Sequence, residues 1–183
     1  MMREGKTGVD RETMRVGIGY DIHRTAAGRR LVLGGIELES EFGLDGHSDA
    51  DVVLHAVSDA LLGASALGDI GDHFPDTAPE WKDADSSVML ARVLALVRDN
   101  GFCISNIDIN IIAQKPRLGE TKAVIRDNIA ALLGLDPTHV SMKAKTKEGL
   151  GPVGAGEAIE ALACVLLEKS QNAEHNPQNA ASA

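Results

Sequence analysis

Aromatic side chains are scarce in this chain of 183 residues, which has three phenylalanines, one tyrosine and one tryptophan. Proteins that bind single-stranded nucleic acid by base stacking need several aromatic residues on one surface, so this class is disfavoured. Basic residues are also in the minority: 18 Lys and Arg stand against 27 Asp and Glu, for a formal net charge of −9. This balance argues against duplex DNA or an anionic membrane as the main partner.

Cysteine and long hydrophobic runs are in short supply as well. The two cysteines, Cys103 and Cys164, stand far apart in apolar runs. They exclude a disulfide framework or a Cys-rich zinc site and favour two buried, reduced thiols. No apolar run reaches membrane-spanning length, and residues 1–15 lack the apolar segment of a secretory signal. We therefore expect a cytoplasmic protein without a membrane partner.

The length predicts one domain, large enough to bury a sizeable core. Residues 1–13 are polar and without periodicity, which is typical of a flexible N-terminal arm. Residues 170–183 are rich in Asn, Gln and Ala, which predicts a disordered C-terminal tail. A single working domain is expected between them, over residues 14–169.

Strand and helix patterns alternate along this domain. Period-two or short apolar segments predict strands at 14–24, 29–38 (one or two strands, broken at Gly34–Gly35), 102–114 and 139–148. Period-3.6 segments with capping residues predict helices at 48–67 (with Ser48 or Asp49 as N-cap), 83–101, 119–134 and 155–169. The order predicts an α/β fold, an α+β sandwich in which helices cover one face of a small mixed sheet.

The string GYDIHR contains the first candidate site. Asp21 and His23 lie two residues apart at the end of a predicted strand, so their side chains point the same way and can bind one ion. An Asp-x-His pair is also common as two surface residues near a turn, and the spacing alone does not separate the two interpretations.

The string HSDADVVLHAVSDA contains the second candidate site. His47 precedes the predicted helix and His55 lies within it, with Asp51 and Asp59 one turn to either side of His55. A solvated helix face is one interpretation. The other adds these histidines to Asp21 and His23 as a zinc site with three protein ligands and an open fourth position. In that case Asp51 or Asp59 orients His55.

Three weaker motifs follow. The string GDIGDHFPDT is punctuated by Gly and Pro, which predicts a loop or a single turn, with His73 as a further candidate ligand. The string KAKTKEGLG has alternating lysines and a Gly-rich turn before a predicted helix, a combination that can bind phosphate. Lysines on an edge strand can instead serve to prevent aggregation. No P-loop motif is present. The string AQKPRLG follows a strand, where its backbone can contact a base.

In this order, five strings resemble the 2-C-methyl-D-erythritol 2,4-cyclodiphosphate synthase family: GYDIHR, LVLGGIEL, HSDADVVLHAVSDALLGASALGDIG with HFPDT, IDINIIAQKP and KAKTKEGLG. The resemblance runs from about Arg15 to Leu167. It implies a homotrimer with sheets packed around a three-fold axis and active sites between neighbouring subunits. It also implies lyase-type cyclisation of 4-diphosphocytidyl-2-C-methyl-D-erythritol 2-phosphate, a nucleotide-linked sugar-alcohol phosphate, to the 2,4-cyclodiphosphate with release of CMP.

The resemblance further implies roles for individual residues. One zinc per subunit is bound by Asp21, His23 and His55, and Glu148 helps to bind Mg²⁺ or Mn²⁺ with the substrate diphosphate. His47 and Thr146 are the catalytic residues. The substrate-binding residues are Asp21, Ile22, His23, His47, Ser48, Asp69, Ile70, Gly71, Phe74, Pro75, Asp76, Thr77, Ala78, Ala113, Gln114, Lys115, Pro116, Arg117, Leu118, Gly119, Lys145, Thr146, Lys147 and Glu148.

The sequence departs from the family pattern after residue 150. Pro152 and Ala155 stand where the family usually has an aromatic residue and an arginine. Without the bidentate fork of an arginine, an isoprenoid diphosphate on the trimer axis is expected to bind weakly. Two other functions remain open: a metal-dependent phosphodiesterase or phosphatase that uses water, and a zinc-stabilised, non-enzymatic module that senses isoprenoid phosphates.

Overall fold

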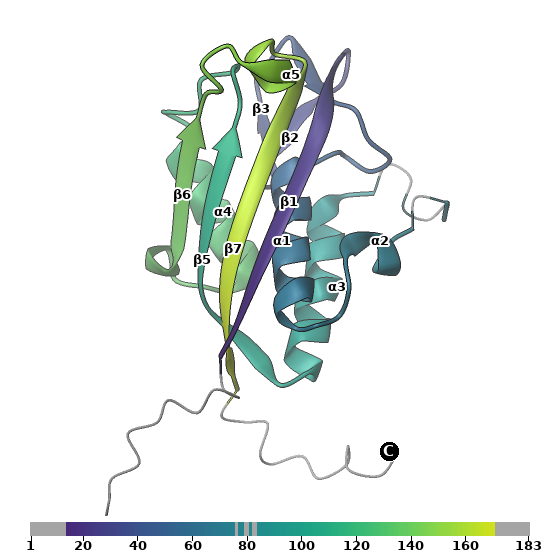
Figure 1. Cartoon of the computed structure of the whole chain (residues 1–183), viewed down its shortest axis with the longest axis vertical. Coiled ribbons are helices and arrows are strands. Elements are labelled where there is room, and N and C mark those ends of the chain that lie inside the picture. The colour runs from purple at the N-terminus through teal and green to yellow at the C-terminus, as the bar shows by residue number, and fades with distance from the viewer. Residues whose placement is uncertain (1–13, 76, 79–80, 82–83, 171–183) are drawn as a thin grey trace, which may run out of the picture.

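The computed structural model describes residues 14–75, 77–78, 81 and 84–170 and shows one sheet with helices behind it (Figure 1). The sheet has five strands in the order β4-β1-β7-β5-β6. β5 and β6 are parallel and the other neighbours antiparallel, so the predicted mixed sheet is confirmed. The strands are β1 (Met14–Ala27), β4 (Phe42–Leu44), β5 (Phe102–Ile112), β6 (Val140–Lys145) and β7 (Ala158–Lys169). The expected arm and residues 171–183 of the expected tail lie outside the described residues.

Three helices cover one face of the sheet, as predicted (Figure 1). They are α1 (Val52–Ala64), α3 (Ser86–Asp99) and α4 (Lys122–Leu133). The N-cap of α1 is Asp51 and not Ser48 or Asp49, because the Asp51 carboxylate accepts the N–H groups of Val53 and Leu54. The short elements are α2 (Ile70–His73), the 3₁₀ helix η2 (Pro137–His139) and α5 (Gly151–Gly154).

A separate hairpin joins β2 (Leu31–Leu33) to β3 (Ile36–Leu38). Its two turn residues, Gly34 and Gly35, have φ angles of 62° and 76°. Positive φ at both central residues is the requirement of the tight hairpin turn whose twist matches the strands. The break expected at these two glycines is therefore confirmed.

The helix predicted over residues 155–169 is wrong. Only the short α5 comes before this segment, and residues 158–169 form β7 in the middle of the sheet. Alternate residues from Ile159 to Leu167 are buried under the helices, while Leu162 and Leu166 on the opposite face are partly buried. Because both faces carry apolar residues and the composition is rich in Ala, Leu and Glu, the period of two is hidden.

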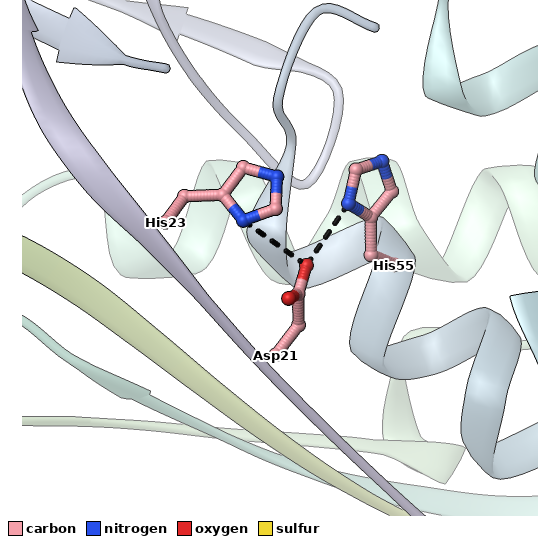
Figure 2. Close-up of side chains that lie close together, drawn as sticks. All are labelled: Asp21, His23 and His55. Carbon is pink, nitrogen blue, oxygen red and sulfur yellow. Dashed lines mark hydrogen bonds and ion pairs between the residues drawn. The ribbon is translucent and has the colours of Figure 1, made fainter. Parts of the chain in front are cut away.

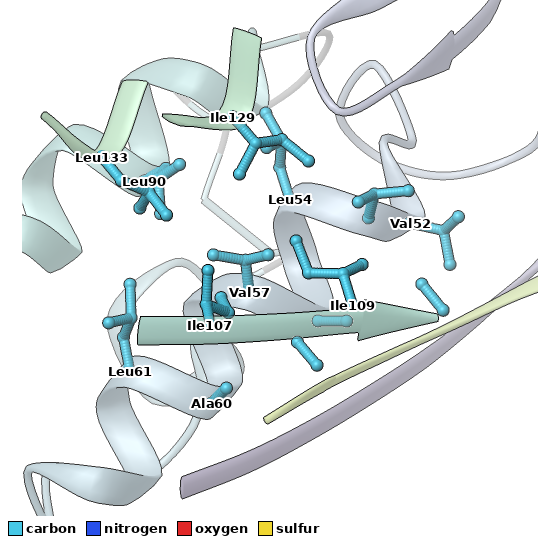
Figure 3. Packing of buried hydrophobic residues seen from close by; sticks show 14 of the residues in the cluster. Val52, Leu54, Val57, Ala60, Leu61, Leu90, Ile107, Ile109, Ile129 and Leu133 are labelled. Carbon is cyan, nitrogen blue, oxygen red and sulfur yellow. The ribbon is translucent and has the colours of Figure 1, made fainter. Parts of the chain in front are cut away.

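The core lies between the sheet and the helices (Figure 3). The isoleucine stripe of β5, Ile107, Ile109 and Ile111, is fully buried there against aliphatic side chains of α1, α3 and α4. The opposite face of the sheet is different. On β1, five large apolar side chains are exposed by 42 to 69%: Met14, Val16, Ile18, Tyr20 and Ile22.

The cysteines are both free, as expected, but they are not both buried. Cys103 is half-buried and Cys164 is exposed on the outer face of β7. Within the described part of the chain, no helix has the length and apolar character needed to cross a membrane.

Candidate functional site

β1 lies directly against the backbone of α1 where its smallest residues face the helix. A Cβ atom at Gly17 or Gly19 would overlap backbone carbonyl oxygens of α1. Alternate residues of a strand share a face, so the same face continues with Asp21 and His23. The two glycines thereby bring both polar side chains within reach of the helix.

Asp21, His23 and His55 converge from β1 and α1 (Figure 2). The Oδ2 atom of Asp21 lies 2.9 Å from Nδ1 of His55 and 3.4 Å from Nδ1 of His23. One ligand atom from each residue lies within 4.8 Å of the other two, and among the described residues this is the only such group of His, Cys, Asp or Glu. The three predicted metal ligands are thus together, whereas His73 is elsewhere, 2.8 Å from the Leu67 carbonyl oxygen.

The three side chains shift the pKa values of Asp21 and His23. Burial alone would raise the pKa of Asp21, but the hydrogen bonds and charges of His23 and His55 outweigh it and hold that pKa well below its ordinary value. Burial likewise opposes the charged form of His23, yet its hydrogen bond to Asp21 and the Asp21 charge raise the His23 pKa. The site therefore combines an ionised carboxylate with two imidazoles.

This donor set fits a zinc ion. One carboxylate oxygen and two imidazole nitrogens are donors that zinc prefers, and three protein ligands leave a fourth position open for a reactant. The side chains are 12 to 24% exposed, so the group is shielded yet reachable from the surface.

His55 is not oriented by either residue that the sequence suggested. Asp51 is buried, and it accepts both backbone N–H groups of the β2–β3 turn in addition to capping α1. Asp59 accepts the N–H group of Ile70 at 2.8 Å and thereby positions the start of α2. The partners of His55 Nε2 are instead the hydroxyl groups of Ser86, at 3.0 Å, and Ser48, at 3.2 Å.

A pocket of about 430 Å³ opens beside the three ligands. Its described lining includes two of the three predicted metal ligands, the HS pair (His47 and Ser48) and the segment around α2. The lining residues are His23, Gly46, His47, Ser48, His55, Ile70, Gly71, Phe74, Pro75 and Met89. The sequence predicted most of these residues. Asp69 caps α2 at the edge of this segment, and Asp76 lies outside the described residues.

Arg29 is a residue that sequence reasoning missed. Its guanidinium donates hydrogen bonds to the carbonyl oxygens of Leu44, Gly46 and Ser48 at 3.1 to 3.2 Å. These contacts bind both ends of the loop that presents His47. No sequence signal links Arg29 to this loop, because backbone carbonyl partners are the same for every residue type.

Among the predicted substrate residues outside this lining, Ile22 is exposed on the outer face of β1, and Ala78 donates its N–H to the Pro75 carbonyl at 3.0 Å. Two longer runs of predicted substrate residues lie at a second location. Residues 113–119 and 145–148 follow β5 and β6 at the edge where both parallel strands end. They are joined to each other, because the Ala113 N–H donates to the Lys145 carbonyl at 2.9 Å. β7 separates β5 from β1, and neither segment contributes to the described lining of the pocket beside His55.

Known proteins are similar to this chain in sequence and in fold. A model of the YgbB family matches residues 14–168. A 2-C-methyl-D-erythritol 2,4-cyclodiphosphate synthase from Geobacter sulfurreducens is 53% identical over 156 residues, which cover 85% of this chain and 99% of that protein.

Solved structures agree with the sequence relatives. A structure titled as 2C-methyl-D-erythritol-2,4-cyclodiphosphate synthase has a TM-score of 0.79 at 40% identity, covering 84% of this chain and 100% of the other. A second such structure, described as a bound form with CDP, has a TM-score of 0.78 at 38% identity and the same coverage. The chain therefore belongs to the YgbB family of 2-C-methyl-D-erythritol 2,4-cyclodiphosphate synthases.

Proposed function

We propose that this chain converts 4-diphosphocytidyl-2-C-methyl-D-erythritol 2-phosphate into 2-C-methyl-D-erythritol 2,4-cyclodiphosphate and CMP. The observation that carries the proposal is the convergence of Asp21, His23 and His55 beside the pocket that also holds His47 and Ser48. Family membership supplies the substrate, since the relatives are named for this product.

The reaction is an internal phosphoryl transfer. An oxygen of the 2-phosphate attacks the β-phosphorus in line, the bond from that phosphorus to the CMP phosphate oxygen breaks, and CMP leaves with the electron pair. Both reacting groups are anionic, so the barrier is electrostatic and entropic, and no protein nucleophile is needed.

Each half of the site has a part in this step. Asp21, His23 and His55 are the ligands for zinc, which when bound supplies positive charge to a phosphate oxygen. His47 and Ser48 face the same pocket and donate to the phosphates, with His47 stabilising the charge of the transition state. The segment Asp69 to Gly71 faces the erythritol hydroxyls in this proposal, and the hydrogen bond from the Ile70 N–H to Asp59 holds it in place.

The segment after β6 supplies the remaining groups. Thr146 donates its hydroxyl to Glu148 at 2.6 Å in the single chain. If Glu148 instead bound Mg²⁺ or Mn²⁺, the Thr146 hydroxyl would be available to donate to a phosphate. Glu148 has a φ of 51°, an unfavourable backbone conformation that is often found at functional positions. Residues 113–119 form the cytidine pocket in this proposal, and the CDP-bound relative supports a nucleotide ligand.

The active protein in this proposal is a homotrimer. One subunit carries two half-sites on different parts of the sheet: the metal half (Asp21, His23 and His55) and the β5–β6 half (residues 113–119 and 145–148). The outer face of β1 exposes a continuous apolar stripe from Met14 to Ile22. Closed packing of three copies through this face would cover the stripe and bring the β5–β6 end of one subunit to the metal side of the next. The cytoplasmic location expected from the sequence stays a prediction.

Phosphorus NMR of the purified protein with the diphosphocytidyl substrate and Mg²⁺ tests the function. The expected products are the cyclic diphosphate and CMP, with no turnover after chelation of the metals. A linear phosphate product would instead establish the water-using phosphodiesterase, and unchanged substrate in the metal-loaded protein would favour the binding module.

A further inference from the structure

His55 is held at both ring nitrogens. Its Nδ1 atom lies 2.9 Å from Asp21 Oδ2, on the side of the proposed metal, and its Nε2 atom lies 3.0 Å from Ser86 Oγ. Ser86 is the first residue of α3 and only 1% exposed. A buried hydroxyl at this distance decides which nitrogen of the imidazole carries the proton.

The hydroxyl of Ser86 has a second partner, Asp49. Ser86 Oγ lies 2.5 Å from Asp49 Oδ1, and the Ser86 N–H donates to Asp49 Oδ2 at 3.1 Å. An ionised carboxylate only accepts hydrogen bonds, so the single hydroxyl proton of Ser86 goes to Asp49. The Ser86 oxygen can then only accept from His55, which requires a proton on Nε2 and makes Nδ1, the nitrogen that faces Asp21, the one that a metal ion would bind.

The backbone fixes this arrangement. The Asp49 N–H donates to the Ala84 carbonyl at 3.0 Å, and the Asp51 N–H donates to Asp49 Oδ1 at 3.2 Å. The loop that carries the HS pair is therefore joined to the start of α3. Asp49 and Ser86 cannot separate unless one of these two segments moves.

We propose that Ser86 and Asp49 are positioning residues that fix the tautomer and ring orientation of His55, so that its Nδ1 lone pair points at the metal. The proposal rests on the metal site of the proposed function. A metal-bound histidine commonly donates its second N–H to an oxygen acceptor, and loss of such a partner typically lowers metal affinity about 10- to 100-fold.

Ser48 has a different role, although its hydroxyl also lies 3.2 Å from His55 Nε2. Ser48 Oγ accepts the Ala50 N–H at 3.2 Å and lines the pocket, so its own proton can be donated to a phosphate. Ser86 does not belong to the described lining of that pocket. Ser86 therefore acts on His55, whereas Ser48 is available to the substrate.

Zinc affinity measured by competition with a chromophoric chelator tests the proposal on the full chain. Ser86→Ala and Asp49→Asn are expected to weaken zinc binding about 10- to 100-fold. Ser87→Ala, which removes a hydroxyl one residue further along α3, is the matched control and should bind zinc like the unmodified protein. Equal affinity in all four proteins would overturn the proposal, while absence of zinc binding by the unmodified protein would overturn the metal site itself.

The tautomer gives a readout that a purely structural role would not change. In the zinc-free protein, imidazole ¹⁵N spectra should show a proton on His55 Nε2 in the unmodified protein, whether or not Nδ1 also donates to Asp21. In Ser86→Ala the Nε2 atom loses this acceptor, and a neutral His55 should carry its one proton on Nδ1, which donates to Asp21. The absence of a proton on Nε2 in the unmodified protein would refute the proposed role of Ser86 and Asp49, even if both variants failed to fold.

Discussion

The two half-sites of this molecule are built differently. At the metal side, Asp21, His23 and His55 are largely buried, lie within hydrogen-bonding reach of one another and have partners behind them. At the β5–β6 side, residues 145–148 are all exposed, and Lys115, Arg117 and Gly119 are exposed as well. The side chains of the metal half are thus held in place within a single chain, whereas most of those at the β5–β6 half are exposed to solvent.

This difference has a physical reason. Ligands of the proposed metal would have to hold their geometry before substrate arrives, and these three residues lie where a strand and a helix pack backbone to backbone. Nucleotide and phosphate groups need donors that reach outward, and lysines at a strand end provide them at little desolvation cost. In a trimer, the exposed half of one subunit would face the buried half of the next.

Mixed trimers give the largest expected effect. His55→Ala should lower kcat about 10³-fold, because it removes a metal ligand. Thr146→Ala should lower kcat about 100-fold, because it removes a donor to phosphate. When the two inactive variants are refolded together in equal amounts, about one quarter of the sites combine two intact halves, so activity should return to about one quarter of the unmodified level.

The recovery is measured as CMP release, with each variant refolded alone as the control. If both halves of a site came from one chain, every site would contain one of the two substitutions. Activity would then stay at the level of the variants refolded alone.

The apolar stripe on β1 gives the next effect. Ile18→Asp places a carboxylate where the proposed trimer buries a side chain that is 67% exposed in the single chain. Light scattering should show about three times the 19.3 kDa chain mass for the unmodified protein and a single chain mass for the variant, with loss of activity. Val124→Asp changes another exposed apolar residue, on α4, and should leave the assembly intact.

The metal half was more predictable from the sequence than the support behind it. Asp21 and His23 share a face because strand geometry has a period of two, and a predicted helix presented His55. Ser86 and Asp49 are 37 positions apart, and their link depends on where α3 begins against the HS loop. Ser86 therefore looked like an ordinary residue at a helix start.

The sheet was less predictable than the helices. α3 begins at the Asp85 cap and α4 ends at Gly134, both of which are local signals in the sequence, whereas β7 is a strand only because β1 and β5 pair with it on both sides. Its alternation of Ala161, Ala163 and Val165 against Leu162 and Leu166 differs little in hydrophobicity between faces. Long-range pairing overrode the local helix propensity there.

The approach of β1 to α1 gives a smaller effect, on stability. Gly19→Ala puts a methyl group into the backbone carbonyl of Ala56, so the strand must move away from the helix. We expect a loss of about 3 kcal/mol in the free energy of unfolding and weaker zinc binding, because Asp21 moves with the strand. Gly63→Ala is the control: its nearest contact would be 3.9 Å away, and a helical alanine should stabilise the protein by up to about 1 kcal/mol. Equal urea midpoints for the two variants would contradict the close packing.

The smallest expected effect comes from Asp51, the buried carboxyl that ties the β2–β3 turn to α1. Burial raises its pKa from 3.8 to about 6, although hydrogen bonds from Gly35, Gly34 and Leu54 oppose the shift. Because the folded state binds this proton more tightly than the unfolded state, the contribution to stability is complete below about pH 4 and is lost as the pH rises through about 6.

Asp51→Asn has no such titration, so the difference in unfolding free energy between the unmodified protein and this variant isolates the group. We expect the advantage of the unmodified protein to shrink by about 2 kcal/mol between about pH 4 and about pH 7, and to stay constant above that. Urea unfolding at several pH values measures it. A difference that is flat over the whole range would mean that the four backbone donors keep Asp51 ionised throughout, and that the metal half is anchored by a permanent buried charge.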